Sequence, residues 1–150
     1  MSKLDLYRLD EPPLPPITLR RSDADRVYEV AVGALLHNPR AAAGLLDELR
    51  RAAVVADDRA GPEVAGIGSY VEYVDQHVSP ERVQRAQLVL PEDARAGDTL
   101  SVLSEFGAAL LGLSPGQSIV WPDRRGGTER LTVVAVQPPR RAARSGAPVR

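Results

Sequence analysis

Few residues of this sequence have the types and spacing that catalysis or metal binding requires. The 150 residues include two histidines, His37 and His77, and no cysteine, so thiolate metal sites are excluded and no histidine pair has ligand spacing. The acidic pairs Asp57-Asp58 and Glu92-Asp93 each fall in a predicted loop, where we expect solvated turn acids. No Ser, His and Asp set has the context of a nucleophile elbow. We therefore predict no enzyme activity, no metal and no cofactor.

The charge balance argues against a duplex nucleic-acid partner. Nineteen Lys and Arg residues stand against twenty Asp and Glu residues, whereas broad DNA binding requires a basic face. We expect no direct sequence-specific nucleic-acid binding, and predict a basic disordered tail at 138–150, with a weak contact to nucleic acid or to a partner protein as its alternative role. No apolar run is long enough to span a membrane, and the first residues lack a signal-peptide core. We therefore expect a cytoplasmic protein.

An antiparallel helical hairpin is predicted at residues 17–58. Apolar residues recur at helical spacing on both sides of an Asn-Pro pair. Ser22 is the expected N-cap of the first helix, and Asn38 that of the second, with Pro39 at its first position. Arms of about 15 residues would project roughly 22 Å. The preceding residues 1–16 contain four prolines and are predicted as a flexible arm.

Period-two patterning begins after a polar linker and predicts a sheet domain at 63–137. Strands are expected at 68–75, 83–90 and 131–136. Between the later strands, a short helix is predicted to begin at its N-cap, Ser104, and to end at Gly112, because glycine adopts the left-handed conformation without strain. The order β-β-β-α-β-β, mostly antiparallel, gives an α+β fold with one helix on its sheet.

The same helix carries a family resemblance. The sequence SVLSEFGAALLGLSPGQSIVWP, which begins at Ser101, resembles the Gre transcription factors, and more closely their Rnk (regulator of nucleoside diphosphate kinase) branch. Tyr70-Val-Glu-Tyr and Leu88-Val-Leu-Pro resemble earlier strands of that family. The resemblance spans about residues 17–137. It implies a bacterial protein with a short coiled-coil hairpin, followed by an antiparallel sheet domain like that of the FK506-binding proteins.

The resemblance also implies a partner. In Gre factors the C-terminal domain grips the rim of the RNA polymerase secondary channel, and acidic residues at the hairpin tip help to hold a catalytic magnesium ion. Here the predicted tip residues, His37, Asn38, Pro39 and Arg40, include no acid, and the next carboxylate along the chain is Asp47. We therefore expect a monomer that competes with Gre factors without stimulating transcript cleavage.

The predicted docking surface on the sheet domain consists of Ser104, Glu105 and Phe106. Gre and Rnk proteins usually have a proline where this chain has Glu105, so a charge replaces an apolar ring. Two alternatives remain: an interaction module with no role at polymerase, or a prolyl isomerase. The second would need an aromatic-lined cleft, whereas Trp121 is expected to help fill the core.

Overall fold

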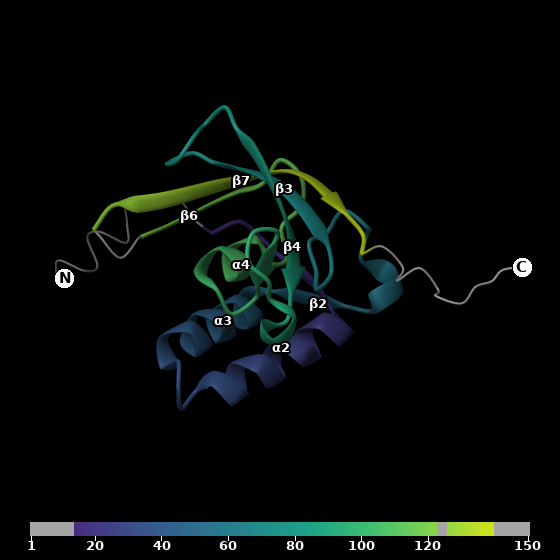
Figure 1. Ribbon diagram of the computed structural model, residues 1–150. Helices are drawn as coiled ribbons and strands as arrows, with labels where there is room; N and C mark the ends of the chain where they lie inside the picture. Colours follow the sequence, from purple (N-terminus) through teal and green to yellow (C-terminus); the bar gives the residue numbers. More distant parts are fainter. Residues whose placement is uncertain (1–13, 123–125, 140–150) are drawn as a thin grey trace, which may run out of the picture.

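The computed structural model describes residues 14–122 and 126–139 as an α+β fold, with a pair of helices beneath a curled sheet (Figure 1). No helix in these ranges is both long enough and apolar enough to cross a membrane. The N-terminal part consists of β1 (Thr18–Arg20), α2 (Arg21–Ala34), α3 (Pro39–Arg51) and β2 (Ala53–Val55).

The sheet domain contains five strands in the order β5-β4-β3-β7-β6. Strand β5 pairs in parallel with β4, while the other neighbours are antiparallel. The sheet is therefore mixed, which corrects the antiparallel prediction, and the likeness to FK506-binding proteins stays a prediction. The elements of this domain, with two 3-10 turns, are η1 (Asp57–Arg59), β3 (Tyr70–Asp75), β4 (Val83–Val89), η2 (Pro91–Asp93), β5 (Thr99–Ser101), α4 (Glu105–Leu110), β6 (Ser118–Pro122) and β7 (Thr128–Gln137).

The two long helices begin differently. The side chain of Asn38 accepts a hydrogen bond from the Ala41 backbone at 3.4 Å, which confirms the predicted N-cap of α3. Helix α2 begins at Arg21, two residues earlier than the predicted N-cap Ser22 implies. Ser22 lies inside its first turn, and the Ser22 N–H donates to Asp57 Oδ1 at 3.0 Å. A carboxylate from η1 therefore satisfies this free amide, and Asp57 is a capping residue as well as a turn acid.

This contact makes stability depend on pH. Hydrogen bonds from Ser22 lower the pKa of the exposed Asp57 carboxyl. A lowered folded-state pKa adds stability above the unfolded pKa of about 3.9, and that stability is lost as pH falls through the folded value. We expect the difference in urea midpoint between pH 7 and pH 3 to be smaller in Asp57→Asn than in the parent protein. Asp58→Asn is the matched control and should behave as the parent; equal changes in both variants would contradict the assignment.

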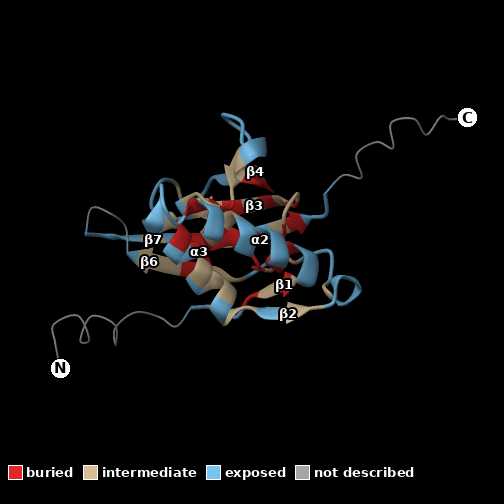
Figure 2. Cartoon of the chain, turned by 90° about the horizontal axis from the view of Figure 1, so that it is seen from below, coloured by how far each residue is buried: buried red, intermediate tan, exposed pale blue. Residues whose placement is uncertain are grey.

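The hairpin lies against the sheet domain instead of projecting from it. Val27, Ala31 and Leu45 are fully buried in the same hydrophobic core as the sheet and α4. Figure 2 shows both helices lying across the sheet, with exposed residues on their outer side. Nearer the tip, Ala34 and Ala42 are buried outside that core. The predicted reach of about 22 Å is therefore wrong, because only the last turns extend past the core.

A polar contact fixes the base of the hairpin. The guanidinium of Arg20 donates to the carbonyls of Gly61 and Val64 at 2.8 and 3.2 Å. The same group lies 3.8 Å from the Asp23 carboxylate, which also accepts from the backbone of Ile67. Burial raises the pKa of Asp23, and the Arg20 charge opposes that rise. These bonds tie the first turn of α2 to the loop before β3.

Removing the buried carboxylate should weaken this attachment. Asp23→Ala leaves the Ile67 amide without its acceptor and the Arg20 guanidinium without its carboxylate partner, and we expect a loss of about 2 kcal/mol in the free energy of unfolding. Urea denaturation followed by circular dichroism measures it. Asp25→Ala, an exposed change in the same helix turn, is the control and should cost well under half as much. Equal losses would show that Asp23 has no special role.

Helix α4 depends on close backbone packing. Ser104 caps it as predicted, since its hydroxyl accepts from the Gly107 amide at 3.1 Å. A Cβ added at Gly107 would lie 1.9 Å from the carbonyl oxygen of Ser101. After the helix, Gly112 has φ +83°, and a Cβ there would lie 2.8 Å from that of Ile17. Glycine is therefore required at both positions, which explains both glycines of the sequence GAALLG.

Two parallel strands close the hairpin at its base, and the sequence did not predict them. Strands β1 and β2 pair in register from Thr18 with Ala53. Ahead of them, the carbonyls of Pro15 and Pro16 accept from the side chains of Arg51 and Gln117. The described end of the predicted arm is therefore held against the fold, and the remainder of that arm, 1–13, lies outside the described residues.

Candidate functional site

The hairpin tip is fully exposed and held in a fixed turn. The Asn38 amide donates to the carbonyl of Ala34 at 2.8 Å, which closes the end of α2 before α3 begins. Pro39 then occupies the first turn of α3, and Leu36 is 99% exposed. The residues predicted as the tip, His37, Asn38, Pro39 and Arg40, are all exposed.

The carboxylates nearest the tip along α3 are already paired. Asp47 lies 3.5 Å from Arg50 on the exposed face. Glu48 lies 2.6 Å from Arg51 in a mostly buried pair, and burial raises the pKa of Glu48 while the bond to Arg51 opposes that rise. Among the described residues, no three His, Asp or Glu side chains gather closely enough to hold a metal ion.

The second predicted surface lies at the start of α4. Phe106 meets Trp121 edge to face, with ring centroids 5.7 Å apart and planes at 81°. The Trp121 indole N–H donates to Glu105 Oε1. The exposed carboxylate of Glu105 is therefore oriented by a side chain from β6, and the charge that replaces the family's proline belongs to a small acidic and aromatic surface.

Trp121 was expected in the core, but it is half-buried at the edge of the sheet. Sequence reasoning therefore missed it as a site residue. Its position on a strand that ends at Pro122 was the available signal, because proline is confined to edge strands. Edge position alone did not indicate its contacts with Glu105 and Phe106, which come from a separate helix.

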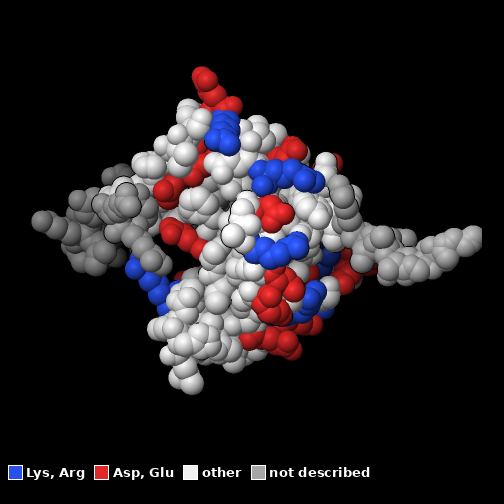
Figure 3. Space-filling model, in the orientation of Figure 1, with Lys and Arg blue, Asp and Glu red and all other residues white. Residues whose placement is uncertain are grey.

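The two predicted surfaces stay separate. Helix α3 packs against α4, and the hairpin tip and the outer end of β6 both point to the left in Figure 1. The structure therefore brings Ser104, Glu105 and Phe106 together with Trp121, whereas the tip residues lie at the N-terminal end of α3. Figure 3 shows acidic and basic side chains interspersed on this face, without a continuous basic area.

An exposed apolar row on α2 also leads to the tip. Tyr28, Val32, Leu35 and Leu36 are all exposed and recur at offsets 0, 4, 7 and 8, so they share one side of the helix end. Tyr28 and Val32 lie off the apolar stripe that predicts this helix, so the helical periodicity did not indicate them. They extend the surface that the tip offers to a partner.

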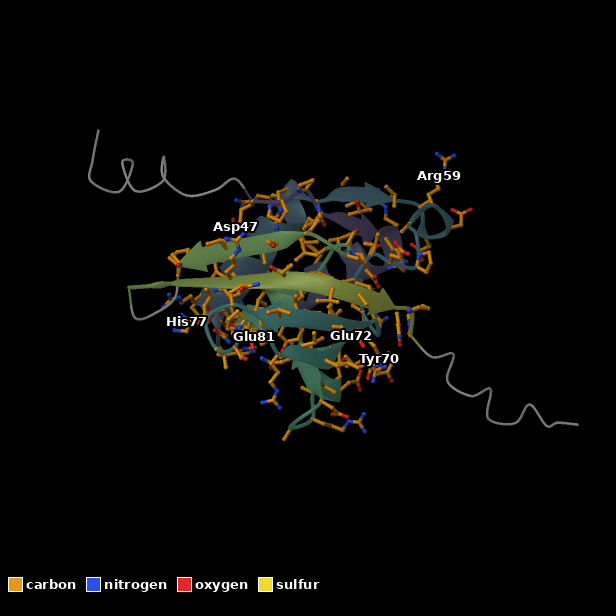
Figure 4. The ribbon with its side chains drawn as sticks, turned by 90° about the horizontal axis from the view of Figure 1, so that it is seen from above. Asp47, Arg59, Tyr70, Glu72, His77 and Glu81 are labelled. Atoms are coloured by element: carbon orange, nitrogen blue, oxygen red, sulfur yellow. The ribbon has the colours of Figure 1, made fainter. Side chains whose placement is uncertain are left out.

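The uncovered face of the sheet carries mixed chemistry. Figure 4 looks onto it, with Tyr70 and Glu72 on β3 and with His77 and Glu81 in the following loop. The guanidinium of Arg85 lies over the Tyr70 ring, 4.5 Å from its centroid.

The described residues form two hollows, one beside the end of β4 and η2, and one between Arg20, Asp23 and the prolines that follow β7. Neither is lined by an aromatic side chain, so neither has the lining that a prolyl isomerase requires.

Family comparisons agree with this geometry. Residues 60–138, the sheet domain, match the model of the C-terminal domain of the GreA/GreB transcription elongation factors. The chain belongs to the GreA/GreB family. Residues 15–55, the hairpin and its strands, match the Rnk N-terminus, so this is a Rnk-like Gre-family protein, as the resemblance indicated. Among curated proteins, no sequence matches the chain.

Solved structures include similar folds. A prokaryotic transcription elongation factor GreA/GreB from Nitrosomonas europaea is 31% identical, with a TM-score of 0.63, over 82% of this chain and 98% of that one. The GreA factor homolog 1 (Gfh1) of Thermus thermophilus is 23% identical, with a TM-score of 0.41, over 82% of this chain and 99% of that one.

Proposed function

We propose that this Gre-family protein is a transcription regulator that docks as a monomer at the RNA polymerase secondary channel in the bacterial cytoplasm. Family membership supports polymerase as the partner. Glu105, Phe106 and Trp121 would contact the channel rim, with Ser104 fixing the start of α4. The tip, from His37 to Arg40, would occupy the channel mouth together with the apolar row on α2.

The observation that carries the functional assignment is the chemistry of the tip. Every side chain from Leu35 to Arg40 is neutral or basic, and Asp47 is paired with Arg50. Magnesium requires oxygen ligands, which in proteins are mostly carboxylates. The tip therefore has no carboxylate with which to hold a catalytic magnesium ion. Such a protein would occupy the channel and compete with Gre factors without stimulating transcript cleavage.

The packing of the hairpin supports the same assignment. Because Val27, Ala31 and Leu45 are held in the main core, the exposed length of the hairpin is only its last turns. A short tip would remain near the channel entrance, away from the catalytic centre. Occupying the entrance is sufficient to block another channel ligand.

A stalled elongation complex tests this function. Alone, the protein should produce no shortened transcripts, and in excess it should slow the cleavage that a Gre factor stimulates. Shortened transcripts with the protein alone would refute the assignment. A pull-down with core polymerase separates it from the alternative of an interaction module with no polymerase role: retention supports the proposal, and its absence supports the alternative.

A further inference from the structure

One exposed carboxylate of this fold is oriented by an aromatic side chain and has no basic partner among the described residues. It belongs to the α4 surface, which consists of Glu105, Phe106 and Trp121. Oε1 of Glu105 accepts from the Trp121 indole N–H, and the edge-to-face packing of Trp121 on Phe106 fixes the indole. No ion pair among the described residues includes Glu105, and its Oε2 accepts no hydrogen bond from them. The carboxylate is therefore held in one orientation with one oxygen left for a cation.

Another part of the same protein shows which group completes such a surface. On the uncovered face of the sheet, the guanidinium of Arg85 lies 4.5 Å from the centroid of the Tyr70 ring. Arg85 also lies directly opposite Glu72 in the register of β3 and β4. A guanidinium is attracted both to the face of an aromatic ring and to a carboxylate, so the three groups stabilise one another. The α4 surface has the carboxylate and the rings, but no described arginine joins them.

We propose that the α4 surface binds an arginine side chain of its partner. The partner's identity rests on the proposed function, which makes it RNA polymerase. The guanidinium donates to Oε2 of Glu105 and lies against the half-buried rings of Trp121 and Phe106, part of which remains exposed. Arginine fits better than lysine, because a planar, weakly hydrated guanidinium stacks on aromatic rings, whereas the ammonium of lysine is strongly hydrated. Because the indole already orients the carboxylate, binding orders less side-chain freedom than it would at an unsupported glutamate.

The competing occupant is an arginine of the chain itself. Arg124 and Arg125 follow β6 closely in the sequence and lie outside the described residues. The experiment therefore has to separate these two side chains from an arginine supplied by a partner.

The experiment uses the full chain, whose single tryptophan is Trp121, so the one indole N–H signal in a proton–nitrogen NMR spectrum reports on this site. N-acetyl-arginine amide is titrated at low salt beside N-acetyl-citrulline amide, which has a similar shape but a neutral urea group, with the chloride concentration matched. We expect the indole signal to shift with the arginine probe and to half-saturate on the order of tens of millimolar, since two exposed contacts are each weak. The citrulline probe should leave the signal unchanged. Equal shifts with both probes, or no shift with arginine, would overturn the proposal.

Glu105→Gln is the decisive variant, because its amide oxygen still accepts from the indole but carries no charge. It should weaken binding of the arginine probe by about threefold or more. Glu81→Gln makes the same change in the exposed loop between β3 and β4 and should leave binding unchanged, and equal weakening in both variants would assign the response to long-range charge and refute the site. The amide spectrum of each variant reports whether it is folded.

A third variant tests the chain's own arginines. Arg124→Gln with Arg125→Gln should also leave binding of the probe unchanged, whereas clearly tighter binding would show that one of these side chains occupies the surface in the parent and would overturn the proposal. Polymerase takes no part in these titrations, so the two proposals can fail separately. Probe binding without retention by core polymerase keeps the arginine site and removes the proposed function, and retention without probe binding does the reverse.

Discussion

Replacing Gly107 with alanine is expected to destabilise the protein by about 3 kcal/mol, the upper range for overpacking a dense core. The added methyl would lie 1.9 Å from the Ser101 carbonyl oxygen, a backbone atom that no side-chain rotation can move. Alanine gains about 1 kcal/mol of helix propensity over glycine, and the clash exceeds that gain. Chemical denaturation measures the difference.

The hairpin offers a matched control of opposite sign. Gly33 and Gly44 lie within helices, and an added Cβ at either would have open space. Alanine at each position should therefore raise the free energy of unfolding, by about 0.5–1 kcal/mol. No close contact among the described residues therefore requires glycine at either position. Destabilisation by both hairpin variants and by Gly107→Ala would mean that the packing around α4 is not special.

Reversing the charge at Glu105 should have the largest effect on partner binding. Glu105→Lys removes the acceptor of the Trp121 indole N–H and inverts the charge beside the exposed aromatic edge. If this surface docks on polymerase, we expect the affinity to fall about tenfold or more. A tenfold loss corresponds to about 1.4 kcal/mol of binding free energy. Competition with a Gre factor for core polymerase measures this change, as the concentration that halves stimulated cleavage.

The control reverses a charge elsewhere. Glu81 is exposed in the loop between β3 and β4, at the other end of β3 from Tyr70 (Figure 4). Glu81→Lys makes the same change in net charge. If this variant keeps the parent's affinity for polymerase, the loss in Glu105→Lys comes from the α4 surface. If both variants lost affinity equally, long-range charge would be the cause, and the α4 surface would not be the docking site.

Elements encoded by local signals were predicted well from the sequence. The caps at Asn38 and Ser104 and the glycine at Gly112 each act through a few neighbouring residues, so residue types and spacing were sufficient. The strands of the sheet domain also follow their predicted order, because alternation of apolar residues is a local pattern.

Features that depend on distant contacts were missed. The carboxylate that satisfies the Ser22 amide comes from Asp57, 35 residues later, and Trp121 reaches Glu105 across 16 residues. The parallel pairing of β4 with β5 depends on the path of the loop between them. The apolar stripe of α2 predicts that one face of the helix is buried, but it does not indicate which element buries it. A hairpin that projects from the sheet domain and one that packs against it therefore have the same sequence pattern.

The parallel pairing of β1 with β2 at the base of the hairpin affects how the protein unfolds. The Ala53 amide donates to the carbonyl of Ile17, and the Thr18 amide donates to the carbonyl of Gly112, so three distant parts of the chain meet at one point. The segments that match the two family models therefore share a core and cannot melt independently. A single cooperative transition is the physical outcome, and shortening the chain to either segment alone would expose the apolar side chains that the other now covers.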